Sequence, residues 1–178
     1  MSGHMLRDAL TNSVKELYSS EQQQLRVLPT LVEAATSRSL RSALIHHQRE
    51  TTHQVRRLEH VFTLLDEPIR WARCPGVLGI LEECQEASEE HVGGAMRDAA
   101  ILATAQRLDY YEMAAYGAAA AWADALGLPA VAELLNQCLD EEVSAADDLL
   151  AVALTRVHVA AAKAMRPVAA VATLAPGA

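Results

Sequence analysis

The strongest constraint on the fold is a helical spacing of apolar residues that recurs along four long stretches of the chain. Within each stretch apolar side chains return every three or four residues, which places them on one face of an α-helix. The pattern predicts helices at about residues 5–35, 38–65, 95–126 and 129–160. Four helices of this length, each with one apolar face, are typical of an all-α helical bundle.

Turn-forming residues separate the predicted helices. "ATSRS" (35–39) lies between the first two, and "GLP" (127–129) between the last two, with Gly just past one helix and Pro at the start of the next. Short connections make consecutive helices antiparallel. The segment 66–95, with a short helix at 77–90, is long enough to cross over. We therefore predict a four-helix bundle of two antiparallel helix hairpins joined by a crossover with a short helix.

One domain accounts for most of the chain, at residues 5–160. The "SGH" that precedes Met5 suggests that residues 1–4 are an expression scar. Residues 161–178 are apolar but contain two prolines and no periodic face, so a flexible or loosely docked tail is expected there. Pro29 lies inside the first predicted helix and predicts a kink near residues 25–29.

Composition and charge narrow the class of function. The net charge of −8 disfavours a nucleic-acid surface, which needs clustered Lys and Arg. The chain has no uncharged apolar run long enough to span a membrane. Its three cysteines form no C-x-x-C motif, and its start lacks the apolar region of a secretory signal. We expect a cytoplasmic protein with reduced thiols and with neither nucleic-acid nor membrane partners.

Carboxylates interrupt the apolar stripes of three predicted helices. Glu21 lies in the first stripe and Glu112 in the third, which passes through either Leu108 or Asp109. Glu142 lies in the fourth stripe, with Glu141 beside it. Any one glutamate can lie at the edge of its stripe and reach water. Isolated charges in a core are costly, however, so buried carboxylates are normally paired or bind a metal.

The spacing of these carboxylates favours a shared site. Glu21 and Glu50 are 29 residues apart, and so are Glu112 and Glu141, while "LYSSE" (17–21) is echoed by "LDYYE" (108–112). A repeated helix pair with a glutamate on each helix would bring four carboxylates to the middle of the bundle. We therefore interpret the carboxylates as one cluster.

The stretch "HHQRETTHQV" (46–55) adds imidazole nitrogen to this cluster. His46, His47, Glu50 and His53 lie along one side of the second helix. Glu50 and His53 form Glu-x-x-His, the spacing with which helical bundles build di-iron and di-manganese sites. Either His47 or His53 can supply the nitrogen. The alternative interpretation is a polar face exposed to solvent.

Carboxylates with one or two histidines suit iron or manganese better than structural zinc, which prefers Cys and His. Four carboxylates would also neutralise most of the charge of two metal ions. We expect two ions, with iron first and manganese as the alternative. The candidate ligands are Glu21, His47, Glu50, His53, Glu112, Glu141 and Glu142.

Four segments of the chain resemble the YciE/YciF-type stress-response proteins, a branch of the ferritin-like superfamily. They are "LYSSEQQQLRVLP", "HHQRETTHQVRRLEHVF", "RDAAILATAQRLDYYEMAAYG" and "LLNQCLDEE", and the resemblance covers about residues 6–150. It implies a ferritin-like four-helix bundle with a dinuclear metal centre and a cytoplasmic role in stress.

The resemblance also implies which residues are ligands. The positions that match the family's pattern are Glu21, His47, Glu50, Glu112, Glu141 and Glu142. His53 matches no fixed family position, and Ala146 stands where the family usually has a carboxylate.

Two hypotheses of function follow. In the first, a homodimeric dinuclear protein reacts with oxygen or peroxide, and oxidase, peroxidase or catalase turnover or simple iron oxidation would all fit. In the second, the chain is a non-catalytic helical interaction module whose site is empty or holds one ion. The Ala-rich run "MAAYGAAAAWA" (113–123) would then offer a dimer surface, although tight packing within the chain explains it equally well.

Overall fold

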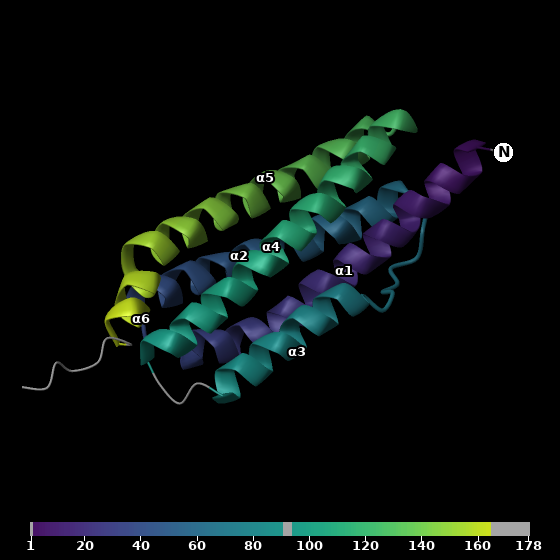
Figure 1. The fold of residues 1–178 in the computed structure, drawn as a ribbon. Helices are drawn as coiled ribbons and strands as arrows, with labels where there is room; N and C mark the ends of the chain where they lie inside the picture. Colours follow the sequence, from purple (N-terminus) through teal and green to yellow (C-terminus); the bar gives the residue numbers. More distant parts are fainter. Residues whose placement is uncertain (1, 91–93, 165–178) are drawn as a thin grey trace, which may run out of the picture.

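The computed structural model describes residues 2–90 and 94–164 of the 178-residue chain, and all of its elements are helical (Figure 1). The elements are α1 (Ser2–Ala34), α2 (Arg38–Leu64), α3 (Pro75–Glu90), α4 (Gly94–Ala125), α5 (Pro129–Val152), the π-helical turn η1 (Ala153–Val157) and α6 (His158–Ala164). The long helices pack as α1–α2, α2–α5, α5–α4 and α4–α1, and α3 packs on α4. The predicted all-α bundle of two hairpins and a crossover is confirmed.

Capping residues set the connection of the first hairpin. Ser37 is the N-cap of α2, and its side chain accepts a hydrogen bond from the backbone N–H of Leu40. The buried carboxylate of Asp98 on α4 accepts hydrogen bonds from both backbone N–H groups of Thr36 and Ser37, at 2.7 Å each. Asp98 therefore ties the α1–α2 turn to the first turns of α4.

The second hairpin turns at a glycine. Gly127 has a φ of 70°, a left-handed conformation that glycine adopts without a Cβ clash. Its N–H donates to the carbonyl of Asp124, and the N–H of Leu128 donates to the carbonyl of Ala123. Pro129 then begins α5, as the "GLP" pattern predicts.

The first long helix ends close to its predicted bound, whereas the last one extends beyond it. Helix α1 includes Pro29 and continues to Ala34, so the proline does not end it. The fourth predicted helix continues past residue 160 to Ala164, interrupted by the π-helical turn. Residues 165–178, which make up most of the expected tail, lie outside the described residues.

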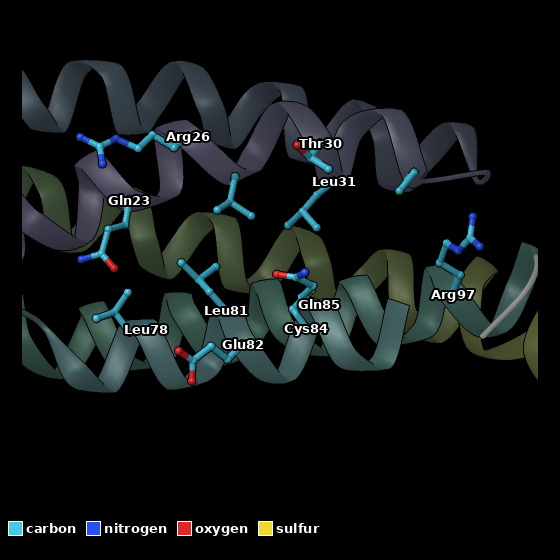
Figure 2. A pocket seen from close by; sticks show the side chains of 12 residues that line it. Gln23, Arg26, Thr30, Leu31, Leu78, Leu81, Glu82, Cys84, Gln85 and Arg97 are labelled. Atoms are coloured by element: carbon cyan, nitrogen blue, oxygen red, sulfur yellow. The ribbon is translucent and has the colours of Figure 1, made fainter. Parts of the chain in front are cut away.

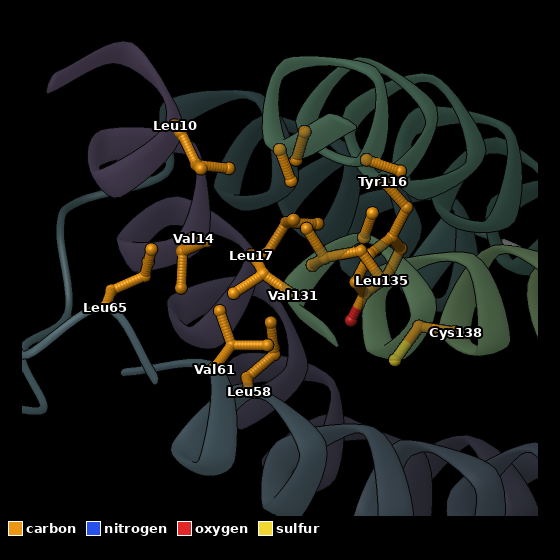
Figure 3. Close-up of a cluster of buried hydrophobic side chains, with 14 of the residues drawn as sticks. Leu10, Val14, Leu17, Leu58, Val61, Leu65, Tyr116, Val131, Leu135 and Cys138 are labelled. Atoms are coloured by element: carbon orange, nitrogen blue, oxygen red, sulfur yellow. The ribbon is translucent and has the colours of Figure 1, made fainter. Parts of the chain in front are cut away.

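Two apolar clusters flank a polar middle section of the bundle. Figure 3 shows the first cluster, in which Leu10, Val14 and Leu17 of α1 meet residues of α2, α4 and α5. The second cluster contains Leu28, Leu31, Leu40, Leu44, Ile101, Leu102 and Leu149. In α1 the buried polar residues between Leu17 and Leu28 belong to the middle section, from which the neighbouring apolar clusters exclude water; they are Ser19, Ser20, Glu21 and Gln24.

Candidate metal centre

Four acids and one imidazole meet in this middle section, each from a helix of the bundle. Glu21 comes from α1, His47 from α2, Asp109 and Glu112 from α4, and Glu142 from α5, and none is more than 4% exposed. They form two groups, Glu21–Glu112–Glu142 and His47–Asp109–Glu142, in each of which one donor atom per residue lies within 4.8 Å of the others. Both groups could hold a metal ion, and Glu142 belongs to both.

Hydrogen bonds from the first hairpin orient the acids of the second. Ser20 Oγ and Gln24 Nε2 donate to Glu112 Oε1 at 2.7 and 2.6 Å. Gln54 Nε2 of α2 donates to Glu142 Oε1 at 2.6 Å. Both acceptors are buried, so these contacts hold one oxygen of each carboxylate in a fixed direction.

Equivalent contacts position Glu21 and His47. Tyr116 Oη on α4 donates to Glu21 Oε1 at 2.5 Å, so this contact runs from the second hairpin to the first. His47 Nε2 lies 3.1 Å from Gln24 Oε1 and 3.8 Å from Asp109 Oδ1. Gln24 therefore connects the imidazole to Glu112, and the two groups of donors form one network.

The remaining polar atoms of the five residues have no hydrogen-bond partner in the part of the chain that the structure describes. They are Glu21 Oε2, His47 Nδ1, Asp109 Oδ1 and Oδ2, Glu112 Oε2 and Glu142 Oε2. A buried polar group without a partner costs about 1–3 kcal/mol. So many unsatisfied donor atoms close together fit metal ions, because coordination would satisfy them without added hydrogen-bond donors.

Burial changes the protonation of these acids. Burial, together with the neighbouring charges of Glu112 and Glu50, raises the pKa of Asp109 to about 8. Burial also raises the pKa of Glu112 to about 7, against the hydrogen bonds from Ser20 and Gln24. Without bound cations these two groups hold protons near neutral pH, and metal ions would displace them.

Burial is also the main cause of the shifted pKa values of Glu21, Glu142 and His47. The pKa values of Glu21 and Glu142 lie well above the ordinary range because of burial and then the charge of Glu112. Burial, together with the charge of His46, lowers the pKa of His47 to about 4. His47 is therefore neutral at physiological pH, which is the form that binds metals.

Three of the predicted ligands lie outside both groups. Glu50 is partly buried and forms an ion-pair contact of 3.2 Å with His46 Nδ1. Glu141 pairs through both carboxylate oxygens with Arg57, at 2.6 and 2.7 Å. His53 is exposed, because the face of α2 that carries His47 and Gln54 points inward and His53 does not share it.

Three residues of the centre were not among the predicted ligands. Asp109 was an alternative to Leu108 in the stripe, and the structure buries both, with Leu108 packed against Cys74 and Val77 in the crossover. Gln24 and Gln54 carry no charge, so neither is among the predicted ligands. The buried Ala146 supplies no carboxylate, whereas Asp109 contributes one from α4.

Comparison with known proteins gives the family. A family model described as a domain of unknown function (DUF892) matches residues 5–162. The chain belongs to this family. It is also similar to the protein YciF of Escherichia coli (strain K12), with 32% identity over 159 residues that cover 89% of the chain and 96% of YciF. The resemblance to YciF-type proteins that the sequence indicates is confirmed.

Solved structures agree with this assignment. The crystal structure of the E. coli stress protein YciF matches with a TM-score of 0.81 and 32% identity, over 86% of the chain and 97% of YciF. YcfI from Rhodopseudomonas palustris, for which a structural role has been suggested, matches with a TM-score of 0.79 and 36% identity, over 81% of the chain and 92% of YcfI. A Xanthomonas campestris protein shares the fold alone, at 16% identity and a TM-score of 0.69, over 91% of the chain and 99% of that protein. The bundle is ferritin-like.

Proposed function

We propose that the protein is a dinuclear metal protein, with iron as the first candidate and manganese as the second, that reacts with oxygen or peroxide in the cytoplasmic stress response. The observation that carries the proposal is the convergence of unpartnered, fully buried donor atoms in two groups that share Glu142. Such a cluster is costly without cations and is stabilised by them.

The donor set divides naturally between two ions. Glu21 and Glu112 would hold one ion, His47 and Asp109 the other, and Glu142 would contact both. The four carboxylates together balance the charge of two divalent cations. Oxygen donors with a single imidazole suit iron and manganese, and the residues present therefore fit the proposed ions.

The bound ions would supply the redox chemistry toward oxygen or peroxide. The chain's own residues would hold and orient the ligands. Gln24 and Gln54 direct the carboxylates of Glu112 and Glu142. Tyr116 keeps a proton on Oη beside Glu21, because burial and then the Glu21 charge raise its pKa well above the usual range.

The cellular part of the proposal comes from relatives. The E. coli relative is a stress protein, and the family match extends over nearly all of the described chain. Within residues 2–90 and 94–164, no helix has the length and apolar content needed to cross a membrane. We extend the proposal to a homodimer in the cytoplasm with no nucleic-acid partner.

Metal content tests this proposal. We would purify the protein without chelator or nickel resin, load it anaerobically with ferrous iron, and count bound ions by plasma mass spectrometry. We expect close to two ions per chain in the wild type and a clear loss in Glu112→Ala. Glu133→Ala, which removes an exposed glutamate of α5, is the matched control and should keep both ions. A wild type that binds no iron would contradict the proposal.

A second candidate function is a non-catalytic interaction module. A groove of about 640 Å³ lies between α1 and α3, and Leu31, Leu78 and Leu81 contribute to its mainly apolar wall (Figure 2). The suggested structural role of the R. palustris relative agrees with a docking function. If stress protection in cells survives Glu112→Ala but is lost when the partly exposed Leu78 and Leu81 are changed to Glu, this second function is the correct one.

A further inference from the structure

A small cavity at the surface of the bundle reaches one donor of the buried centre, His47. Its volume is about 20 Å³, enough for roughly one water molecule or one cation, and it lies between α2 and α5. The exposed side chains of His46 and Asp148 line it on the outer side. On the inner side it is lined by His47, which is 4% exposed and whose Nδ1 has no hydrogen-bond partner in the described structure.

The other four donors of the centre are less exposed than His47. Glu21, Asp109 and Glu112 are all 0% exposed, and the two apolar clusters cover the ends of the middle section. Further along the α2–α5 interface, the paired side chains of Arg57 and Glu141 close the surface. His47 is the least covered of the five donors, and it lines the cavity.

The cavity carries two carboxylates, whereas the Arg57 end of the same interface carries a balanced ion pair. Glu50 lies in the cavity wall with only 16% of its side chain exposed. The exposed Asp148 of α5 lines the outer side of the cavity. At the Arg57 end a guanidinium offsets the carboxylate of Glu141, so that end has no excess negative charge. Two carboxylates against the imidazole of His46 leave the cavity with a negative excess, which raises the local concentration of cations and their rate of association.

We propose that divalent cations enter the buried centre through this cavity, with Glu50 as the carboxylate that takes them from Asp148 at the surface and passes them to His47 and Asp109. This inference rests on the proposed dinuclear function. It gives Glu50 a role different from that of a permanent ligand. His46 Nδ1 lies 3.2 Å from Glu50 Oε2, so this imidazole contacts the carboxylate that would receive the cation.

The test compares the rate of metal uptake with the final number of ions. Metal-free protein would be mixed with Co²⁺ in a stopped-flow instrument, the bound ion followed by its visible absorption, and the final count taken by equilibrium dialysis. We expect roughly ten-fold slower uptake in Glu50→Gln and a smaller slowing in Asp148→Asn, each with the wild-type final count. Glu133→Gln removes an exposed charge from α5 away from the cavity and should bind at the wild-type rate.

The outcomes separate this inference from the function on which it rests. A lower final count in Glu50→Gln would make Glu50 a ligand and overturn the entry role. Uptake in Glu50→Gln and Asp148→Asn as fast as in Glu133→Gln would place the entry route elsewhere. A wild type that binds two Co²⁺ ions keeps the proposed centre in both of those cases, whereas a wild type that binds none overturns the centre and the entry route together.

Discussion

The two helical hairpins of the bundle share a spacing but contribute different chemistry to its centre. The α4–α5 hairpin supplies three of the four acids, Asp109, Glu112 and Glu142. The α1–α2 hairpin supplies one acid, Glu21, and the imidazole of His47. Its other polar residues at the centre are neutral hydrogen-bond donors to the acids of the second hairpin.

The difference shows that neither hairpin forms the centre alone. Most hydrogen bonds to the acids cross from one hairpin to the other, including the one from Tyr116 to Glu21. In addition to burial, the charge of Glu112 raises the pKa of Asp109 and Glu142, whereas the neutral donors of α1 and α2 act against burial on the pKa of Glu112 and Glu142. The centre is therefore a product of docking the hairpins, and its two halves should respond differently to mutation.

The largest loss of bound iron is expected from a mutation in α5, where the adjacent Glu141 and Glu142 have different surroundings. Glu142→Ala removes the residue common to both groups, so we expect the iron count to fall from about two ions per chain to near zero. Plasma mass spectrometry of iron-loaded protein measures this. The matched control is Glu141→Ala, which breaks the pair with Arg57 and should keep both ions. Equal losses of iron in Glu142→Ala and Glu141→Ala would contradict the assignment of Glu142 alone as a ligand.

A smaller effect is expected from the neutral donors of the first hairpin. Gln24→Ala and Gln54→Ala remove amides that orient Glu112 and Glu142, and loss of such supporting contacts typically weakens metal binding about 10–100-fold. Competition with a chromophoric chelator gives the affinities. Gln137→Ala, at an exposed position of α5, is the control. Unchanged metal affinity in both Gln24→Ala and Gln54→Ala would mean that these two amides do not determine how the carboxylates are oriented.

The acids of the second hairpin also predict how the stability of metal-free protein depends on pH. The pKa values of Asp109, about 8, and Glu112, about 7, are raised in the folded state, so that state binds more protons than the unfolded chain. The two acids therefore contribute their full stabilisation at pH values below their unfolded pKa. This contribution is lost as pH rises through their folded pKa values. From pH 6.5 to 8 we expect a loss of roughly 2 kcal/mol, or about 4–8 °C in Tm.

His47 acts in the opposite direction but in a different range. Its pKa is lowered to about 4, so its contribution is lost as pH falls from about 6.5 toward 4. Thermal unfolding with excess chelator at pH 6.5, 7.2 and 8 isolates the acids. Metal-loaded protein is the control, and its Tm should not fall over this range, because bound cations keep the acids ionised. A rising Tm in the metal-free protein would contradict the raised pKa values.

The smallest effect is expected at His53, which the structure places on the exposed side of α2. His53→Ala should leave the iron count unchanged and shift stability by no more than about 0.5 kcal/mol, as is usual at exposed positions. His47→Ala on the same helix should lose the ion at the His47–Asp109 group. Loss of iron in His53→Ala would restore the Glu-x-x-His interpretation of this helix.

The fold was predictable because its signals are local. Apolar spacing gives the helices, and the residues at 35–39 and 127–129 give the turns, as the cap at Ser37 and the left-handed Gly127 show. The continuation past residue 160 was not predictable in the same way. It depends on the packing of α6 against α4, which no short segment encodes.

The centre was predictable only in part, because its details depend on how each helix is rotated. Glu21, Glu112 and Glu142 interrupt apolar stripes and were therefore visible. The choice between Leu108 and Asp109 depends on α3, which covers Leu108 and leaves Asp109 facing the centre. Likewise, the partner of Glu141 is Arg57 on another helix, and a repeat of 29 residues cannot reveal that pairing.

The most direct test of the central claim is anomalous X-ray diffraction at the iron edge from crystals of iron-loaded protein. We expect two anomalous peaks within the bundle, one among Glu21, Glu112 and Glu142, the other among His47, Asp109 and Glu142. Peaks only at the surface, or none within the bundle, would contradict a dinuclear centre built on Glu142.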